Sequence, residues 1–239
     1  MDFNDKLIEL NTFGYSSIKN FFSESEVESL LNCIEIYKHK AAEATKNNDL
    51  FVIRGLINTI PELKHIIFNN DFINLLGNFF ESNYFLTKGI YFDKLPKSNW
   101  FVAYHQDLSI SVNKKVEVNG FKNWTNKKGI YGVQPPECIL NNSITIRVHL
   151  DDTTQKNGAL RVIPKSHTKG IITKNSANWN LDNEYICEAK KGSIMLMKPL
   201  LLHASSKTIN DKRRRVIHLE FNSNALPKPL EWAEFQLVK

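Results

Sequence analysis

The stretch NWFVAYHQDLSI, residues 99–110, is rich in aromatic and β-branched residues and predicts a β-strand. His105 and Asp107 interrupt its apolar run. Because strand side chains alternate between two faces, these two residues share a face and Gln106 points away, which is a suitable geometry for a pair of metal ligands. A His and an Asp two residues apart are more often a hydrogen-bonded structural pair, so a third ligand is needed before the stretch indicates a metal site.

Short β-rich runs follow one another through most of the chain after residue 82, separated by turn residues. The other runs are NYFLTKGIYFD (83–93), SITIRVHLDD (143–152), GALRVIP (158–164), GSIMLMKPLLLHAS (192–205) and RRVIHLEFN (214–222). This pattern predicts a mainly β fold of the jelly-roll or a related sandwich type. The Asn157-Gly158 pair predicts a two-residue hairpin turn, because both central positions of a type I′ turn need positive φ.

Two helical stretches precede the β-rich part. In the first, within residues 20–46, Ser23 is a candidate N-cap, Glu26 follows three residues later as in a capping box, and Phe22 precedes the cap. The second, PELKHIIFNNDFINLLGNFF (61–80), opens with a proline in the first-turn position and carries apolar residues three and four apart. We therefore expect N-terminal helices over both stretches.

The chain has the length and composition of one domain. Its 239 residues are 42% hydrophobic and 11% aromatic, which is enough for a substantial core. We expect a single domain over residues 1–239, with a helical part over 1–82 and a β core over 83–225. Residues 113–136 form a long polar segment without clean periodicity, and we interpret it as a candidate lid over a site.

Charge and cysteine content restrict the partners and the compartment. The formal net charge of +6 has no long Lys/Arg block behind it, so we attribute it to solvated surface and expect no nucleic-acid partner. A basic module that binds nucleic acid remains a rival, and it predicts strongly salt-dependent binding. The three cysteines show no C-x-x-C spacing, and the sequence has neither a signal-like N-terminus nor a long apolar run. We therefore expect a cytoplasmic protein that does not associate with membranes.

His203 is the third candidate ligand, 98 residues after His105 (203 − 105) at the end of another apolar run. Two histidines and one carboxylate form the facial triad of non-haem Fe(II) oxygenases, although zinc sites use the same ligand types. Arg214 begins a strand that we expect to form a hairpin beside the strand of His203. Its guanidinium matches a carboxylate bidentately, as binding the distal carboxylate of 2-oxoglutarate requires, and Ser205 could add a hydroxyl donor.

The chain resembles the phytanoyl-CoA dioxygenase family of Fe(II)/2-oxoglutarate oxygenases. The resemblance is carried by FGYSSIKNFFSESEVESL (13–30), YHQD (104–107), QKNGALRVIPKSHTKG (155–170) and HASSKTINDKRRRVIHLEF (203–221), in the family's order and spacing. It implies a double-stranded β-helix, cupin-like in architecture. It also implies that His105, Asp107 and His203 bind Fe(II) and that Arg214, with Ser205, anchors 2-oxoglutarate.

The activity that this resemblance implies is hydroxylation of a small-molecule metabolite, which consumes O2 and 2-oxoglutarate and releases succinate and CO2. The carboxylate of Asp107 argues against halogenation, because related halogenases place a halide where that carboxylate would be. Desaturation and ring closure need the same triad and stay open. The alternative function is a non-catalytic β-barrel that binds a metal or a small ligand. Neither the substrate nor the oligomeric state follows from the sequence.

Three further arginines flank the expected site. Strand alternation places Arg213 and Arg215 on the face opposite Arg214, where they are solvated or paired. Arg147 shares a face with Thr145 and His149, and burying its charge unpaired would be costly, so it either pairs with Asp151 or holds an anionic group of the substrate. In the second case, we expect the aromatic residues of the lid to contact the same substrate, namely Phe121, Trp124 and Tyr131.

Overall fold

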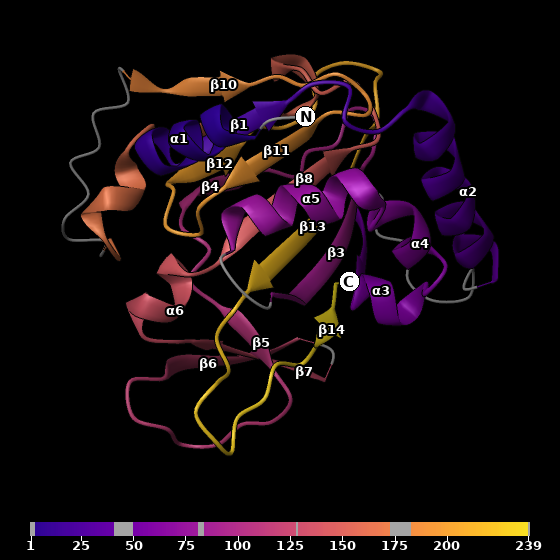
Figure 1. Cartoon of the computed structure of the whole chain (residues 1–239). Helices are drawn as coiled ribbons and strands as arrows, with labels where there is room; N and C mark the ends of the chain where they lie inside the picture. The colour runs from indigo at the N-terminus through magenta and orange to yellow at the C-terminus, as the bar shows by residue number, and fades with distance from the viewer. Residues whose placement is uncertain (1–2, 41–49, 81–83, 128, 173–182, 239) are drawn as a thin grey trace.

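The structure is a computed structural model that describes residues 3–40, 50–80, 84–127, 129–172 and 183–238. Two antiparallel sheets face each other, and most of the helices lie outside one of them (Figure 1). From β3 to β13, the strands other than β5, β6 and β7 are divided between these two sheets. This arrangement confirms the predicted mainly β fold of the double-stranded β-helix, or jelly-roll, type.

The larger sheet contains seven strands in the described part of the chain. Its order is β1-β11-β8-β13-β3-β14, and β2 pairs with a further part of β3. The strands are β1 (Tyr15–Ile18), β2 (Leu50–Arg54), β3 (Phe85–Lys94), β8 (Ile144–His149), β11 (Ile194–Met197), β13 (Arg214–Asn222) and β14 (Gln236–Leu237). Residues 1–82, where we expected a helical part, contain five described helices and also contribute β1 and β2 to this sheet, and β14 lies beyond residue 225.

The smaller sheet has the order β10-β9-β12-β4 and faces the inner side of the larger one. Its strands are β4 (Val102–His105), β9 (Leu160–Val162), β10 (Tyr185–Cys187) and β12 (His203–Ser205). A third sheet, β5-β7-β6, consists of β5 (Ile110–Val112), β6 (Lys122–Lys127) and β7 (Ile130–Gln134). Three short helical turns connect strands: α6 (Glu137–Asn141), η1 (Gln155–Asn157) and η2 (Ser166–Lys169).

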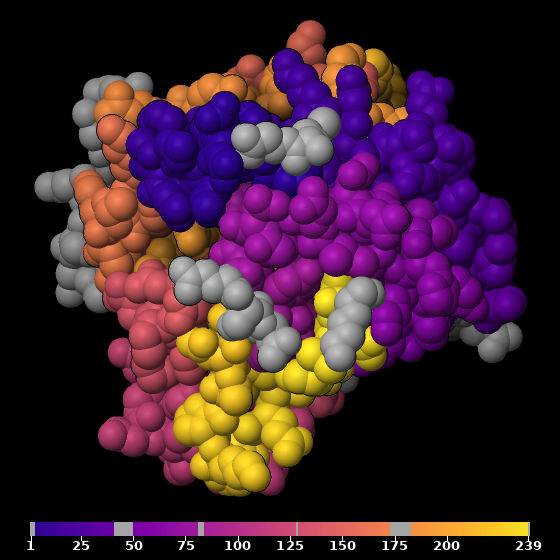
Figure 2. Space-filling model, in the orientation of Figure 1, coloured from indigo at the N-terminus to yellow at the C-terminus, as the bar shows by residue number. Residues whose placement is uncertain are grey.

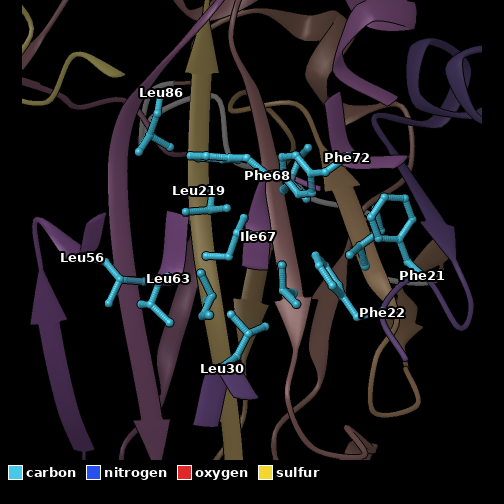
Figure 3. Packing of buried hydrophobic residues seen from close by; sticks show 14 of the residues in the cluster. Phe21, Phe22, Leu30, Leu56, Leu63, Ile67, Phe68, Phe72, Leu86 and Leu219 are labelled. Atoms are coloured by element: carbon cyan, nitrogen blue, oxygen red, sulfur yellow. The ribbon is translucent and has the colours of Figure 1, made fainter. Parts of the chain in front are cut away.

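Helices cover the outer face of the larger sheet (Figures 1 and 2). They are α1 (Asn4–Phe13), α2 (Glu24–Lys40), α3 (Leu56–Thr59), α4 (Leu63–Ile67) and α5 (Asn70–Phe79). The main core lies between them and the sheet, and Figure 3 shows Leu30, Phe72 and Leu219 packing there. On β8, Ile146 and Val148 belong to this core, so the alternate residues of that strand face the other sheet. The helical layer therefore leaves the inner face for polar side chains.

The predicted N-terminus of α2 is confirmed. The backbone N–H of Ser23 donates to Oε2 of Glu26 at 2.8 Å, and the backbone N–H of Glu26 lies 3.3 Å from the hydroxyl of Ser23. Phe22 and Val27 are both buried in the main core, as expected for residues on either side of a helix start.

The predicted single helix over residues 61–80 is divided into two. α4 ends at Ile67 and α5 begins at Asn70, because the side chain of Asn69 accepts the backbone N–H of Phe72 at 3.0 Å and caps the second helix. The apolar spacing continues across the break, so periodicity alone did not reveal it.

Two predictions for the turns and strands were also wrong. Asn157 ends a 3₁₀ turn and Gly158 alone has positive φ, at 84°, so the pair forms no type I′ hairpin and instead leads the chain from one sheet to the other. The expected strand over residues 99–110 ends at His105 and resumes as β5. Residues 192–205 likewise form two strands, β11 and β12, which belong to different sheets.

The candidate lid over residues 113–136 contains regular structure. Its strands β6 and β7 pair with each other, and β7 also pairs with β5. The polar composition reflects exposure of β6, in which Trp124 is the only residue that is not exposed. None of the described helices is long and apolar enough to cross a membrane, and all three cysteines are free thiols.

Candidate functional site

The two expected histidine ligands lie opposite each other on neighbouring strands of the smaller sheet. His203 on β12 pairs directly with His105 at the end of β4, and their ring centroids are 4.2 Å apart. Nε2 of His105 lies 3.6 Å from Oδ1 of Asp107, and Nε2 of His203 lies 3.7 Å from Oδ2. One ligand atom from each residue therefore lies within 4.8 Å of the other two, so the three residues could hold a metal ion.

Backbone carbonyls fix the orientation of both imidazole rings. Nδ1 of His105 lies 2.9 Å from the carbonyl oxygen of Ala103, and Nδ1 of His203 lies 2.9 Å from that of Leu201. Because a carbonyl can only accept, Nδ1 carries the hydrogen in each ring. Each Nε2 then presents a lone pair toward Asp107, which is the tautomer that a metal ion needs.

Asp107 lies two residues beyond the end of β4, so the strand alternation expected for it does not apply. Its backbone N–H donates to the carbonyl of Pro199 at 2.9 Å. The side chain of Gln106 donates to the carbonyls of Leu200 and Gly170, at 2.7 and 2.9 Å. These bonds attach the residues after β4 to the segment before β12 and to the residue that follows η2. The convergence of the carboxylate with the two imidazoles therefore depends on contacts between loops.

The electrostatics of the three residues suit a divalent cation. Burial opposes ionisation of Asp107, but the neighbouring histidines outweigh it and hold the pKa of this carboxyl well below its usual value. Burial lowers the pKa of His203 to about 4, so its imidazole is neutral at pH 7. Oδ2 of Asp107 is buried and has no hydrogen-bond partner among the described residues. The hydrogen bond and charge of Asp107 outweigh burial and raise the pKa of His105. An ionised carboxylate between two imidazoles fits a divalent cation, whose binding displaces any proton held on their Nε2 atoms.

Arg214 begins β13 in the larger sheet, across the interior from the two histidines. The expected hairpin of β13 beside the strand of His203 was wrong, because β13 pairs with β3 and β8 while β12 pairs with β4 and β9. The side chain is 3% exposed, and its Nε and Nη1 have no acceptor among the described residues. Burial and the nearby Arg147 lower the pKa of Arg214 to about 9, so the guanidinium remains charged at pH 7.

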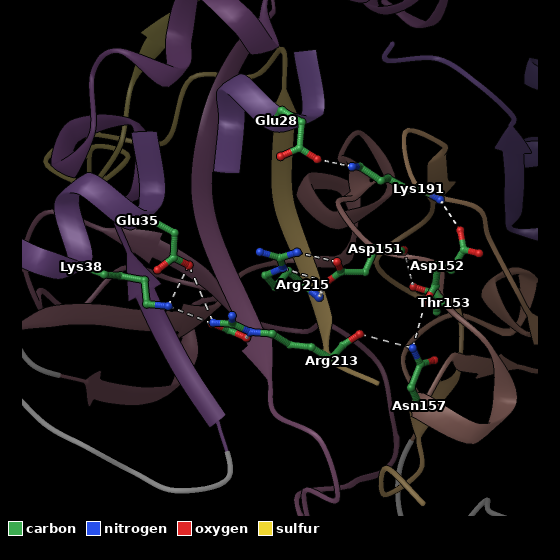
Figure 4. Close-up of polar contacts among 11 residues, drawn as sticks. Glu28, Glu35, Lys38, Asp151, Asp152, Thr153, Asn157, Lys191, Arg213 and Arg215 are labelled. Atoms are coloured by element: carbon green, nitrogen blue, oxygen red, sulfur yellow. Dashed lines mark hydrogen bonds and ion pairs between the residues drawn. The ribbon is translucent and has the colours of Figure 1, made fainter. Parts of the chain in front are cut away.

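The flanking arginines are paired on the other side of the strand (Figure 4). Nε of Arg213 donates to Oδ1 of Asp93 at 2.5 Å. Arg215 binds Asp151 through Nε at 2.8 Å and Nη2 at 2.6 Å. Of the three consecutive arginines, Arg214 is therefore the one left for a ligand in the interior.

A cavity of about 430 Å³ connects the metal-ligand residues with Arg214. All six sequence-predicted residues of the metal, co-substrate and anion sites line it: His105, Asp107, Arg147, His203, Ser205 and Arg214. The hydroxyl of Ser205 donates to the carbonyl of Gly158 at 3.1 Å in this structure. Its role as a donor to 2-oxoglutarate stays a prediction.

The aromatic residues of the candidate lid lie elsewhere. Phe121, Trp124 and Tyr131 pack in a separate hydrophobic cluster and are absent from the described lining of the cavity. From the β6–β7 hairpin, the lining residues are Thr125, Lys127, Ile130 and Gly132. Alternation explains the difference, because on each strand the lining residues lie an odd number of positions from Trp124 or Tyr131 and so face the opposite side. The hairpin forms part of a wall, but the predicted substrate contacts of Trp124 and Tyr131 have no support in this placement.

Four polar residues of the wall were missed by the sequence interpretation. They are Lys88, His218, Glu220 and Glu234, all of which line the cavity. In β13, His218 and Glu220 share a face with Arg214, so parity along RRVIHLEF could have identified them. Glu234 follows the last long strand and carries no periodic signal.

This fold and this ligand set define a metal-dependent enzyme of the double-stranded β-helix class. A family model described as phytanoyl-CoA dioxygenase matches residues 10–216. The chain therefore belongs to the phytanoyl-CoA dioxygenase family, within the Fe(II)/2-oxoglutarate-dependent oxygenases, whose cofactors are Fe(II), 2-oxoglutarate and O2.

Solved structures similar to this one share its fold at low sequence identity. ThoJ, described as a non-heme monooxygenase, has a TM-score of 0.73 at 14% identity over 98% of this chain and 84% of its own. SnoN, a non-heme alpha-ketoglutarate-dependent epimerase from nogalamycin biosynthesis, has a TM-score of 0.71 at 12% identity over 98% and 95%. HygX from Streptomyces hygroscopicus, with nickel, 2-oxoglutarate and hygromycin B bound, has a TM-score of 0.67 at 14% identity over 99% and 97%. No curated protein matches the chain.

Proposed function

We propose that the protein is a dioxygenase that hydroxylates a small-molecule metabolite with release of succinate and CO2. The observation that carries this proposal is the buried, unpaired guanidinium of Arg214 across one cavity from the His105, Asp107 and His203 ligand set. A co-substrate with a chelating end and a distal carboxylate accounts for both groups, whereas a simple metal-binding barrel leaves Arg214 without a ligand.

In this proposal the protein positions the reactants and excludes water. His105, Asp107 and His203 hold Fe(II), and Arg214 holds the distal carboxylate of 2-oxoglutarate. When bound, Fe(II) and 2-oxoglutarate supply the activation of O2 that makes an unreactive C–H bond accessible to oxidation. The carbonyls of Ala103 and Leu201 keep the imidazoles in the metal-binding tautomer, so the ligand set is formed before the metal arrives.

Some structural relatives support the reaction class more than the reaction outcome. Besides the monooxygenase and the epimerase, they include SnoK, described as a non-heme alpha-ketoglutarate-dependent carbocyclase. We propose hydroxylation because Asp107 completes the triad, and we further propose one catalytic domain over residues 1–239 in the cytoplasm. HygX binds hygromycin B, so a polar small molecule is a reasonable substrate class for this cavity as well.

Reconstitution under anaerobic conditions tests the proposal. The protein is loaded with Fe(II) and 2-oxoglutarate and then exposed to oxygen, alone and with a library of small metabolites, while succinate is measured. We expect slow succinate formation without substrate and faster formation with the productive metabolite, whose product gains one oxygen atom. A product that loses two hydrogen atoms would indicate desaturation or ring closure, and an unchanged mass would indicate epimerisation. Binding of Fe(II) and 2-oxoglutarate without any succinate would support the non-catalytic barrel.

A further inference from the structure

Arg147 is a second buried cation in the wall of the same cavity. It lies in the middle of β8, between Met195 on β11 and His218 on β13. Its side chain is 7% exposed. The position is therefore central in the larger sheet, and the guanidinium has little access to bulk water that could solvate its charge.

No acid of the described chain neutralises this guanidinium by a direct ion pair. Its Nη1 lies 3.1 Å from Nδ1 of His218, and its Nε is buried without any partner. The acid expected as its partner from the sequence, Asp151, is bound by Arg215. The internal ion pair that would give Arg147 a purely structural role is absent.

A hydrogen-bonded chain holds Arg147 in place without cancelling its charge. A guanidinium has no acceptor, so Nδ1 of His218 accepts from Arg147 and its Nε2–H donates to Glu220 at 3.0 Å. In this arrangement the ring carries its hydrogen on Nε2 and offers Nδ1 as the acceptor. Glu220 in turn binds Nζ of Lys88 through both carboxylate oxygens at 2.8 Å. Lys88 therefore balances the charge of Glu220, the one carboxylate in this series of hydrogen bonds.

Among the buried cations of the described wall, Arg147 is the one that has neither a direct acidic partner nor an assigned ligand. The described cationic residues of the wall are Arg54, Lys88, Lys127, Arg147 and Arg214, and the acidic ones are Asp107, Glu220 and Glu234. Asp107 faces the metal position, Glu220 pairs with Lys88, and 2-oxoglutarate accounts for Arg214. Arg54 and Lys127 are exposed, and Glu234 binds the backbone N–H of Gly89. An anionic ligand would offset the cost of burying Arg147.

Position separates this ligand from the co-substrate. Arg147 pairs with His218, which is four residues along β13 from Arg214, so the two arginines attach to the sheet about 13 Å apart along the strand. The five-carbon chain of 2-oxoglutarate is only about 6 Å long at ~1.5 Å per bond. The separation of these two backbone positions exceeds the length of 2-oxoglutarate, which favours a different anion at Arg147.

We propose that Arg147 binds a carboxylate of the primary substrate and that His218 is a positioning residue for its guanidinium. The inference rests on the proposed function, because it assigns the substrate class of that site. With Nη1 bound to His218, the edge that carries Nε is free, and this side-on edge matches a planar carboxylate.

Binding of matched probes tests the proposal without a known substrate. The protein is loaded with Mn(II) and 2-oxoglutarate, and the proton relaxation of butanoate, hexanoate and octanoate is compared with that of the corresponding amides. We expect at least one acid to bind at least tenfold more tightly than its amide. Arg147→Gln should remove this preference for the acid. Arg215→Gln is a matched control on the opposite face, and it should lower the melting temperature but retain the preference for the acid.

Calorimetric titration with 2-oxoglutarate distinguishes the possible failures. If wild-type protein binds neither Mn(II) nor 2-oxoglutarate, the proposed function fails. If it binds both but no acid is preferred over its amide, only the present inference fails. If Arg147→Gln weakens 2-oxoglutarate binding as strongly as Arg214→Gln, then Arg147 belongs to the co-substrate site and the inference is overturned.

Two variants of His218 test its positioning role and also serve if Arg147→Gln does not fold. Glutamine offers one acceptor and one donor, as His218 does, so His218→Gln should retain the preference for the acid. His218→Leu should reduce that preference at least fivefold and leave 2-oxoglutarate binding unchanged. Equal acid preference in both variants at equal thermal stability would show that His218 has no positioning role.

Discussion

Arg214 and Arg147 both face the cavity with guanidinium nitrogens that lack an acceptor among the described residues. Burial lowers the pKa of both groups, to about 9 for Arg214 and about 10 for Arg147, yet both remain charged at pH 7. The fold stabilises neither charge with a direct acidic partner, so both positions are costly in the empty protein. A loss of stability of this kind is expected at positions where the residue type serves ligand binding and not the stability of the fold.

Replacing Arg214 by glutamine should raise the Kd for 2-oxoglutarate by more than tenfold, because a charge-assisted bidentate contact in a dry site contributes roughly 1.5–3 kcal/mol. Arg213→Gln is the matched control. It loses an ion pair with Asp93 on the opposite face, so it should lower the melting temperature and leave the Kd unchanged. Titration calorimetry with the metal-loaded protein measures both constants, and a reversed pattern would contradict the assignment.

Substitution of a single metal-ligand residue should remove the metal without unfolding the protein. We expect His105→Ala, Asp107→Ala and His203→Ala each to bind less than a tenth of the wild-type amount of Fe(II), because two remaining ligands form an incomplete site. Elemental analysis after desalting gives the bound metal, and circular dichroism gives the fold. His167→Ala is the control, since its Nε2 lies 3.1 Å from the carbonyl of Asn11, far along the chain from the triad. Full metal binding by any triad variant would contradict the site.

Glu234 should make the protein less stable as the pH rises. Burial raises the pKa of its carboxyl from 4.5 to about 7, so between these values the native state binds the proton more tightly than the unfolded chain. Stability is therefore lost as pH rises across this window, by at most about 3 kcal/mol. Glu234→Gln keeps an acceptor for Gly89 and should flatten the dependence when urea unfolding is measured from pH 4.5 to 8. A parallel wild-type and variant profile would show that the carboxyl titrates normally.

Motif spacing in the sequence predicted His105, Asp107, His203 and Arg214 as one site, and all four line the cavity. The parity argument for Asp107 did not hold, because this residue lies beyond the end of β4. Glu234 could not be predicted in this way. It approaches β3 only through the folded path of residues 223–238, where it caps the backbone N–H of Gly89. Trp124 and Tyr131 illustrate the opposite failure, since aromatic side chains in a segment interpreted as a loop looked available, whereas pairing of β6 with β7 turns them away from the cavity.

Among the elements, the junction between α4 and α5 shows how a side chain can override a continuous apolar period. Asn69 caps α5 through its Oδ1 and donates from Nδ2 to Glu26 at 2.8 Å. Glu26 is also the acceptor in the capping box of α2. One residue thus joins the starts of two helices that cover the larger sheet. The cap could have been identified from Asn69 and the first-turn Asp71, but the long-range bond to Glu26 could not.

Asn69→Ala should lower the free energy of unfolding by about 1–2 kcal/mol, because it removes the cap and the bond to Glu26 together. The neighbouring Asn70→Ala is the control, since Asn70 is exposed and begins the helix. Urea unfolding measures both changes. A double-mutant cycle with Glu26→Gln should show a coupling of at least about 0.5 kcal/mol between the two helix starts. Strict additivity would indicate that the helices are capped independently.

In the whole molecule, the two sheets carry different parts of the site. The histidines belong to the smaller sheet, and Arg214 and Arg147 belong to the larger one. Sequence patterns predicted the fold class but not this division, because the expected hairpin placed His203 and Arg214 on adjacent strands. When a connection leads the chain from one sheet to the other, the pairing partner of the next strand depends on the packing of the whole fold. Local β-propensity carries no information about that partner.

Metal and 2-oxoglutarate should therefore stabilise the protein jointly. Each ligand that binds only the native state adds about 2.7 kcal/mol when its free concentration is 100 times its Kd. Thermal unfolding with Mn(II), with 2-oxoglutarate and with both should show a larger effect of 2-oxoglutarate when the metal is present. Arg214→Gln should lose the part due to 2-oxoglutarate and keep the part due to the metal, while His203→Ala should lose both. Independent effects of the two ligands would contradict a shared cavity.

The position of β13 between β8 and β3 has a consequence for synthesis on the ribosome. Residues 85–94 and 144–149 leave the exit tunnel well before residues 214–222, the strand that joins them. Until then, both strands have an unpaired edge in the middle of the future sheet. Since domains generally fold as units, the nascent chain joins β3 and β8 into one sheet only after residue 222 has left the exit tunnel. A chain on a ribosome that stalls before β13 therefore lacks Arg214 and leaves the inner edges of β3 and β8 unpaired, where other strands can add to them.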